Sequence, residues 1–331
     1  MFEKFANPKS LFVPKGPPLP YPGSETADIE EIFQAGSGNE ILVDQNGEVV
    51  YYANHLNLQF WNFIDKSKFW DLQELEAVKP GQDLDFPVDS LEIKSSWRVA
   101  KRENEWLIPN AEERFYLVET EIPEVDEGGN VKEDKAQATM ALVGLHVVGV
   151  VKGHHEFIWG TFEHLDNAPN CDALESKNPV TGQDWSFYDG RATKQQCNQF
   201  DPGRPMRPAN VCRVQPQGGG KDKNRENIRN LNEQAHELTR NTIWANYEYV
   251  GAIWTDGKIP LNNPFPNELR GSLALANTTI ETFKQDENCF SCHNASERYV
   301  TAGNKPVKIK GKHLNLSHFV VNYQASRLAD N

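Results

Sequence analysis

Residues 139–151 read TMALVGLHVVGVV, the longest stretch of the chain that is rich in apolar residues. Because successive side chains of a strand point to opposite faces, Met140, Leu142, Gly144 and His146 would share one face and the residues between them the other. Both faces are then apolar, which is typical of a strand inside a sheet. We predict a central strand here.

Two hairpins are predicted on the N-terminal side of this strand. Residues 115–118 would pair with it across an acidic loop that contains Glu124, Asp126 and Glu127. Further upstream, residues 41–43 and 49–52 flank Asn46-Gly47, a residue pair typical of a two-residue type I′ turn. Residues 8–22 are rich in proline and predict an extended arm.

The C-terminal side of the strand changes character. Residues 166–222 are rich in proline, contain three consecutive glycines and lack a sustained period, so we expect a long irregular segment. Apolar residues then recur every three or four positions from Ile228 to Tyr249, which predicts an amphipathic helix. A further helix is predicted from Ser272 through Phe283 toward Cys289.

Cys289-Phe290-Ser291-Cys292-His293 has the most direct chemical meaning. Two thiols three positions apart, with histidine directly after the second, form the attachment pattern of c-type haem. Each cysteine adds across a haem vinyl group, and the imidazole binds the iron. Two alternatives stay open: half of a zinc site, which needs a second close Cys or His pair, and a thioredoxin-like redox dithiol.

On these five residues the chain resembles the c-type cytochromes. The resemblance implies one covalent haem (heme c) held by Cys289 and Cys292, with His293 as the proximal iron ligand. The chain has one such motif, and no methionine follows His293. The resemblance therefore identifies a cofactor and no subfamily.

The residue opposite His293 decides whether the iron transfers electrons or binds small molecules. His146 is the first candidate for this distal ligand, because an imidazole within apolar sequence needs a partner. A core histidine that is hydrogen-bonded to backbone or carboxylate is the competing interpretation. The other candidates are His55, His154, His155, His164, His236, His313, His318, Met140 and Met206.

Together these patterns predict an α+β fold with three parts. We expect an extended proline-rich arm over residues 1–37, a β-rich and loop-rich body over 38–220, and a helical haem-binding region over 221–331. Hydrophobic residues make up 38% of the 331 residues, enough to build a core within a loop-rich protein.

The composition limits the partners. Lys and Arg number 34 against 47 Asp and Glu, which gives a net charge of −13 and argues against nucleic acid and anionic membrane. A basic redox partner would suit this charge, and solubility alone would also explain it. No apolar run is long enough for an integral membrane segment.

Cysteine usage and the motif bear on the compartment. Haem is normally attached covalently outside the cytoplasm, so we expect a periplasmic or other extracytoplasmic protein whose signal sequence has been removed. Cys171, Cys197 and Cys212 fit an oxidising compartment, and one disulfide among them would leave one free thiol. Cys197 with Cys212 closes the shortest loop, and Cys171 with either is the alternative.

Two classes of function follow from the motif. The favoured one is a monohaem electron carrier that exchanges single electrons with a soluble redox protein. The alternative is a haem enzyme or sensor, peroxidase-like or able to bind a diatomic gas, with an open distal position. The alternative is motivated by the length of the chain ahead of the motif, because an electron carrier does not need so many residues there.

Overall fold

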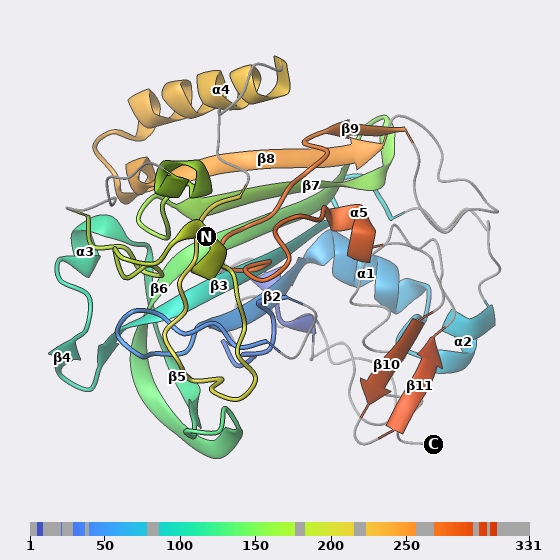
Figure 1. Ribbon diagram of the computed structural model, residues 1–331. Coiled ribbons are helices and arrows are strands. Elements are labelled where there is room, and N and C mark those ends of the chain that lie inside the picture. The colour runs from blue at the N-terminus through green and yellow to red at the C-terminus, as the bar shows by residue number, and fades with distance from the viewer. Residues whose placement is uncertain are drawn as a thin grey trace.

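In the computed structural model, β6 (Val131–Val151) lies between β3 and β7 in a nine-stranded antiparallel sheet (Figure 1). This position confirms the predicted central strand. The strand order is β1-β2-β3-β6-β7-β8-β9, with β4 beside β3 and β5 beside β6. The structure describes residues 5–8, 21, 29–36, 40–77, 86–175, 183–214, 223–255, 268–293, 298–302 and 305–309.

The remaining elements are short apart from a few strands and one helix. The other strands of the sheet are β1 (Phe5–Ala6), β2 (Tyr51–Asn57), β3 (Leu91–Arg102), β4 (Glu105–Trp106), β5 (Leu117–Val125), β7 (His154–His164), β8 (Tyr247–Thr255) and β9 (Leu269–Gly271). The helices are α1 (Leu58–Lys66), α2 (Leu72–Ala77), α3 (Ala111–Arg114), α4 (Lys223–Thr239) and α5 (Cys289–Cys292). A separate two-stranded sheet pairs β10 (Arg298–Ala302) with β11 (Lys305–Ile309).

Both predicted hairpins are present, with different turns. The pairing of β5 with β6 runs from Leu117 opposite Ala141 to Val125 opposite Val131. Most of the predicted acidic loop is therefore strand, and only residues 126–130 form the turn. In the first hairpin, Val43 bridges Val49, but φ is positive only at Gly47 in this turn (84°). A type I′ turn needs a positive φ at both central residues, so that prediction is wrong.

A register shift in β6 changes which side chains share a face. The pairing of β6 with β3 slips by one residue at Val143. As a result, Met140, Leu142 and Leu145 pack in the same core cluster. The prediction that Met140 and Leu142 share a face with His146 is wrong, because simple alternation assumes that no extra residue is inserted.

The predicted α+β fold class with a helical C-terminal haem region is wrong. The described chain is mainly the antiparallel sheet, with few helices, and β8 and β9 belong to that sheet although they follow residue 220. Helix α4 confirms the first part of the predicted amphipathic helix. It ends at Thr239, where the Thr242 hydroxyl donates to the Thr239 carbonyl and accepts from Trp244 N, starting a short 3-10 turn before β8.

Residues 272–288 form turns where a helix was predicted. Asn277 Oδ1 accepts from the backbone N–H of Thr279 at 3.0 Å, and the Thr282 hydroxyl donates to the Thr278 carbonyl at 2.7 Å. Side chains of this kind compete with the helical backbone for hydrogen bonds. Residues 272–293, called here the motif segment, therefore cross the sheet in an irregular path.

The motif segment packs on one face of the sheet, called here the motif face. Register and alternation place Tyr52, Lys94, Ser96, His146 and Trp159 on this face. Helices α1 and α5 share a core cluster with β6 and β7 there, and Figure 1 shows α5 near α1. Helix α4 runs along β8 at the edge of the sheet.

The irregular segment after β7 matches the prediction. Its described residues contain only two short 3-10 turns, at Cys171–Glu175 and Lys194–Gln196. A disulfide joins Cys171 to Cys212, which is one of the predicted alternatives. One of the three cysteines is a free thiol, as predicted, and it is Cys197. Burial raises the pKa of Cys197 to about 12. None of the helices in the described ranges has the length and hydrophobicity that a bilayer crossing requires.

Candidate functional site

Helix α5 is a single turn that carries the motif. Asn288 caps it: its side-chain oxygen accepts from Phe290 N at 2.9 Å, and the Ser291 hydroxyl reaches back to Asn288 N. The turn closes where His293 N donates to the Cys289 carbonyl at 2.7 Å. This capping box fixes the ends of a turn that would not persist alone, and it sets the spacing of the two cysteines and the histidine.

Both motif cysteines carry thiols that are not in a disulfide, and their surroundings differ. Cys289 is half-buried and packs against the core cluster, whereas Cys292 is exposed and donates to Glu287 Oε2 at 3.7 Å. Burial, reinforced by the negative charge of Glu281, raises the pKa of the Cys289 thiol well above its usual range. The Cys289 sulfur is therefore protonated at neutral pH.

His293 lies against Trp159 of β7, with ring centroids 4.0 Å apart. Trp159 is only 6% exposed, and its indole N–H makes no hydrogen bond to any part of the chain that the structure describes. A buried donor without an acceptor costs about 1–3 kcal/mol. An acceptor on a bound group would remove this cost beside His293.

The residues around α5 fit a haem by this criterion. A haem carries two carboxylates as hydrogen-bond acceptors and a flat apolar body. Phe290 and Trp159 form an apolar ring contact beside His293, with ring centroids 6.5 Å apart, and the indole N–H supplies a donor. Cys289, Cys292 and His293 would hold the group.

A charged cluster lies on the motif face close to the thiols. His146 Nε2 is 2.9 Å from Glu281 Oε1, and Lys94 is the cross-strand neighbour of His146 on β3. Burial alone would raise the pKa of Glu281, but His146 and Lys94 outweigh it and hold that pKa below its usual range. Burial lowers the pKa of Lys94, which lies within electrostatic reach of Cys292.

Buried hydroxyl contacts hold the motif segment against β2 and β3. The Tyr52 hydroxyl donates to the Thr279 carbonyl at 2.7 Å, and the hydroxyls of Thr279 and Ser96 lie 2.6 Å apart. Gly144 makes this approach possible, because a Cβ there would collide with both hydroxyls. The segment therefore lies directly on the backbone of β6.

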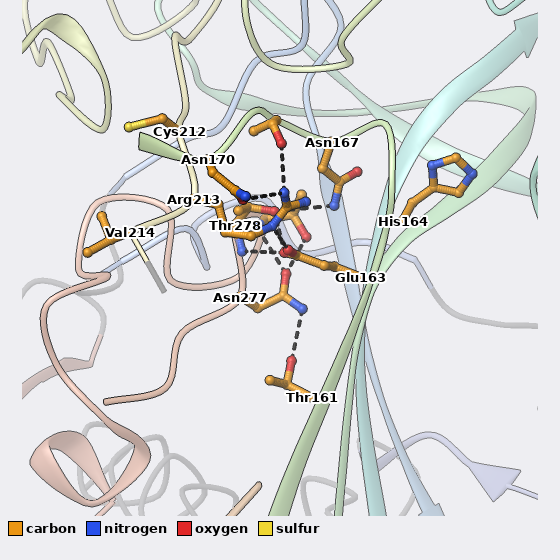
Figure 2. Close-up of polar contacts among 12 residues, drawn as sticks. Thr161, Glu163, His164, Asn167, Asn170, Cys212, Arg213, Val214, Asn277 and Thr278 are labelled. Carbon is orange, nitrogen blue, oxygen red and sulfur yellow. Dashed lines mark hydrogen bonds and ion pairs between the residues drawn. The ribbon is translucent and has the colours of Figure 1, made fainter. Parts of the chain in front are cut away.

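A second network, shown in Figure 2, joins the motif segment to β7 and to the loop that the Cys171–Cys212 disulfide closes, called here the disulfide-linked loop. Glu163 of β7 pairs with the buried Arg213, which follows Cys212. Glu163 Oε2 also accepts from the backbone N–H of Thr278 at 3.0 Å. Next to it, Asn277 donates to the Thr161 hydroxyl at 2.9 Å. One carboxylate thus links three separate parts of the chain.

The structure brings the motif and His146 to the same face of the sheet. Val148 is opposite Trp159, so His146 and Trp159 are diagonal neighbours with Cα atoms roughly 7–8 Å apart. The carboxylate partner of His146 matches the competing interpretation of a hydrogen-bonded histidine. Iron binding by His146 stays a prediction.

The other candidate ligands lie elsewhere. His55 is on the face of β2 opposite Tyr52, while His164 and His236 contact backbone carbonyls of Arg114 and Tyr247. His154 lies beside Glu156 at the start of β7, and Met140 and Met206 contact the other core cluster. The His155 side chain, His313 and His318 lie outside the described residues.

Glu281 and Lys94 were not expected at the site. Glu281 is the only charged residue between Arg270 and Lys284, and this isolated charge is the signal that could have identified it. Lys94 gives no such signal, because one lysine in an alternating strand is ordinary. Among the residues that the structure describes, no three His, Cys, Asp or Glu side chains are grouped to hold a metal ion.

Compared with protein-family models, curated proteins and solved structures, the chain matches none.

Proposed function

We propose that this chain attaches one haem covalently through Cys289 and Cys292, binds its iron through His293, and transfers single electrons to a soluble redox protein outside the cytoplasm. The observation that carries the proposal is the single turn α5, which presents two cysteine thiols and an imidazole beside a buried indole N–H that has no acceptor among the described residues. The alternative of a redox dithiol needs a thiol of lowered pKa. The pKa of Cys289 is raised.

Attachment needs no reactant besides the two thiols and the two vinyl groups. Each sulfur forms a bond to one vinyl carbon, and the thiol hydrogen ends on the other carbon, so nothing leaves and nothing is oxidised. The raised pKa of Cys289 keeps that hydrogen on sulfur, and the Asn288 capping box keeps the thiols one turn apart. When bound, the haem supplies an iron that alternates between ferric and ferrous states.

The surroundings of α5 support electron exchange with a protein. Cys292 is exposed, and Leu273, whose carbonyl accepts from the Asn288 amide at 2.9 Å, is 59% exposed. A group held at this position has an edge near the surface. The net charge of −13 would speed association with a basic partner and make it depend on salt.

The His146–Glu281 pair favours a second candidate function, catalysis or small-ligand binding at an open distal position. Nε2 of His146 is engaged by Glu281. A carboxylate that holds an imidazole in this way is the arrangement of a general acid or base.

Covalent attachment is tested by producing the chain in a host that matures c-type haem outside the cytoplasm. We expect a coloured protein that keeps its pigment after acid–acetone extraction. The Cys289→Ala/Cys292→Ala variant should lose the covalent pigment, whereas Cys197→Ala, which removes the third free thiol, should keep it. Complete extraction, or a colourless protein that contains zinc, contradicts the proposal.

The distal position is tested by the spectrum of the ferrous protein with CO. An unperturbed low-spin spectrum supports electron transfer, and ready CO binding supports the second candidate. In the His146→Ala variant, a changed ferric spectrum identifies His146 as the distal ligand, and an unchanged one excludes it.

A further inference from the structure

A cavity of about 560 Å³ lies in the disulfide-linked loop, away from α5 in sequence. Residues between Asp189 and Asn210 form most of its wall, and Ile41 and Phe283 complete it. Pockets that bind small molecules have volumes of about 300–1,000 Å³. The cavity is therefore large enough for a small organic ligand.

The loop that forms the cavity is held in shape without regular secondary structure. Asn198 N donates to the Asn210 carbonyl at 2.8 Å, and Asn198 Oδ1 accepts from Cys212 N at 3.0 Å. The Cys171–Cys212 disulfide and a capping box at Thr193 add to these contacts. Ordering a long irregular loop costs conformational entropy. Such loops are uncommon in compact domains, and those that are ordered usually have a function.

The charge of the cavity is opposite to that of the protein. Three arginines line it, Arg191, Arg204 and Arg207, although the net charge of the chain is −13. Arg204 pairs with Asp201 at 2.8 Å, while Asp189 accepts from the backbone N–H groups of Arg191 and Ala192. Asp189 and Asp201 also line the cavity and lie within electrostatic reach of Arg191 and Arg207, so the three guanidinium groups outnumber the carboxylates by one.

The cavity also has an aromatic wall. The rings of Phe200 and Phe283 lie 5.5 Å apart, and the exposed amide side chains of Gln195 and Gln199 stand beside them. A guanidinium binds carboxylate and phosphate groups through paired hydrogen bonds. Guanidinium groups in excess over carboxylates, next to apolar surface, therefore match an anion that also has an apolar part.

We propose that this arginine-lined cavity binds a small organic anion, whose carboxylate or phosphate group engages Arg191 and Arg207 and whose apolar body contacts Phe200. The site is separate from the haem motif, and the proposal does not depend on haem attachment. The haem experiments and this proposal can therefore fail independently.

The proposal is tested by calorimetric titration of the full chain with phenyl phosphate, benzoate, inorganic phosphate and phenol. We expect phenyl phosphate, benzoate or both to bind. Their relative affinities show whether the cavity prefers a phosphate or a carboxylate group. Inorganic phosphate should bind at least about tenfold more weakly, since it lacks the apolar body. Phenol binding as tightly as the anions, or no binding by either aromatic anion, overturns the proposal.

Three matched variants locate the site. Arg191→Gln and Arg207→Gln should each weaken binding of the aromatic anion by about tenfold or more, because each removes charge-assisted hydrogen bonds. Arg240→Gln removes an equal charge just after α4 and should leave the affinity unchanged. The assignment is overturned if the two cavity variants bind the anion as tightly as the unmodified protein does. It is also overturned if Arg240→Gln loses as much affinity as they do. The cavity arginines are exposed, so unchanged thermal unfolding will show that the variants fold.

Discussion

The nine-stranded sheet and the motif segment across it are held in different ways. The sheet depends on continuous backbone pairing and on apolar clusters that many side chains share. The motif segment contributes Leu275, Ile280 and Phe290 to apolar clusters as well. Its irregular backbone is positioned by single polar contacts to the strands beneath, made by Asn277, Thr278, Thr279 and Glu281. The position of the motif can therefore be disturbed by one substitution at a time, whereas the sheet is supported at many points.

The largest effect is expected at the carboxylate that joins the two regions. Glu163→Gln removes the ion-pair partner of the buried Arg213 guanidinium and should lower the free energy of unfolding by about 3–5 kcal/mol in urea denaturation. Asp201→Asn, which breaks an exposed ion pair with Arg204, should leave the free energy of unfolding nearly unchanged. A cost below about 1 kcal/mol for Glu163→Gln would mean that the two regions are not linked here.

Acid should weaken the sheet before it affects the motif segment. His164 at the end of β7 accepts from Asp166 N through Nδ1 and donates to the Arg114 carbonyl, so the folded protein holds it neutral. Burial lowers the pKa of His164 to about 4, and that of His55 to the same value. Because both pKa values lie below the unfolded value of about 6.5, stability is complete above that pH and falls as the pH drops toward 4.

Each of these histidines should lower the free energy of unfolding in urea by about 2 kcal/mol when the pH falls from 7 to 5. Glu281, whose pKa is held below its usual range, stays ionised in this window. His164→Gln should remove about half of the pH dependence. An equal slope in this variant would contradict the assignment to His164.

Two glycines on neighbouring strands differ in how closely the motif segment approaches them. A Cβ at Gly144 would collide with the hydroxyls of Thr279 and Ser96, so Gly144→Ala should displace the motif segment at a cost of about 1–3 kcal/mol. Gly160→Ala is the matched control, since the nearest atom to its Cβ is the Val147 carbonyl oxygen at 3.6 Å. Thermal unfolding of both variants gives the comparison, and equal midpoints would show that the segment does not lie where Gly144 places it.

The smallest effects are expected at two helix caps. Asn57 caps α1 and Asn288 caps α5, each accepting from a backbone N–H in the first turn. Asn57→Ala should cost about 1 kcal/mol of global stability, because α1 packs into the core cluster. Asn288→Ala should instead raise hydrogen exchange at the Phe290 amide while the global stability changes little. Faster exchange throughout β6 in Asn288→Ala would contradict the separation of the two regions.

The same difference explains what could be predicted from the sequence. The apolar run around Val143 is long enough to predict the centre of the sheet, because a buried strand must be apolar on both faces. The spacing of Ala276, Ile280 and Phe283 predicts a helix, but Asn277 and Thr278 use their polar groups locally and on β7. Ala276 and Ile280 are buried, as their spacing indicates, but periodicity does not report the polar contacts that keep the backbone out of a helix.

The site divides in the same way. The roles of Cys289, Cys292 and His293 follow from the local pattern, whereas the contacts of His293 with Trp159 and of His146 with Glu281 join residues more than a hundred positions apart. The disulfide is similar: loop length favours Cys197 with Cys212, but a bridge between Asn170 and Arg213 brings Cys171 beside Cys212. Such pairings depend on the complete fold.

Covalent haem at the motif is tested most directly by mass spectrometry of the tryptic peptide Gln285–Arg298 from protein matured outside the cytoplasm. We predict the mass of the peptide plus one haem, with Cys289 and Cys292 both protected from alkylation and the iron-free form absent. A peptide of unmodified mass whose two thiols both react with the alkylating reagent would contradict the account.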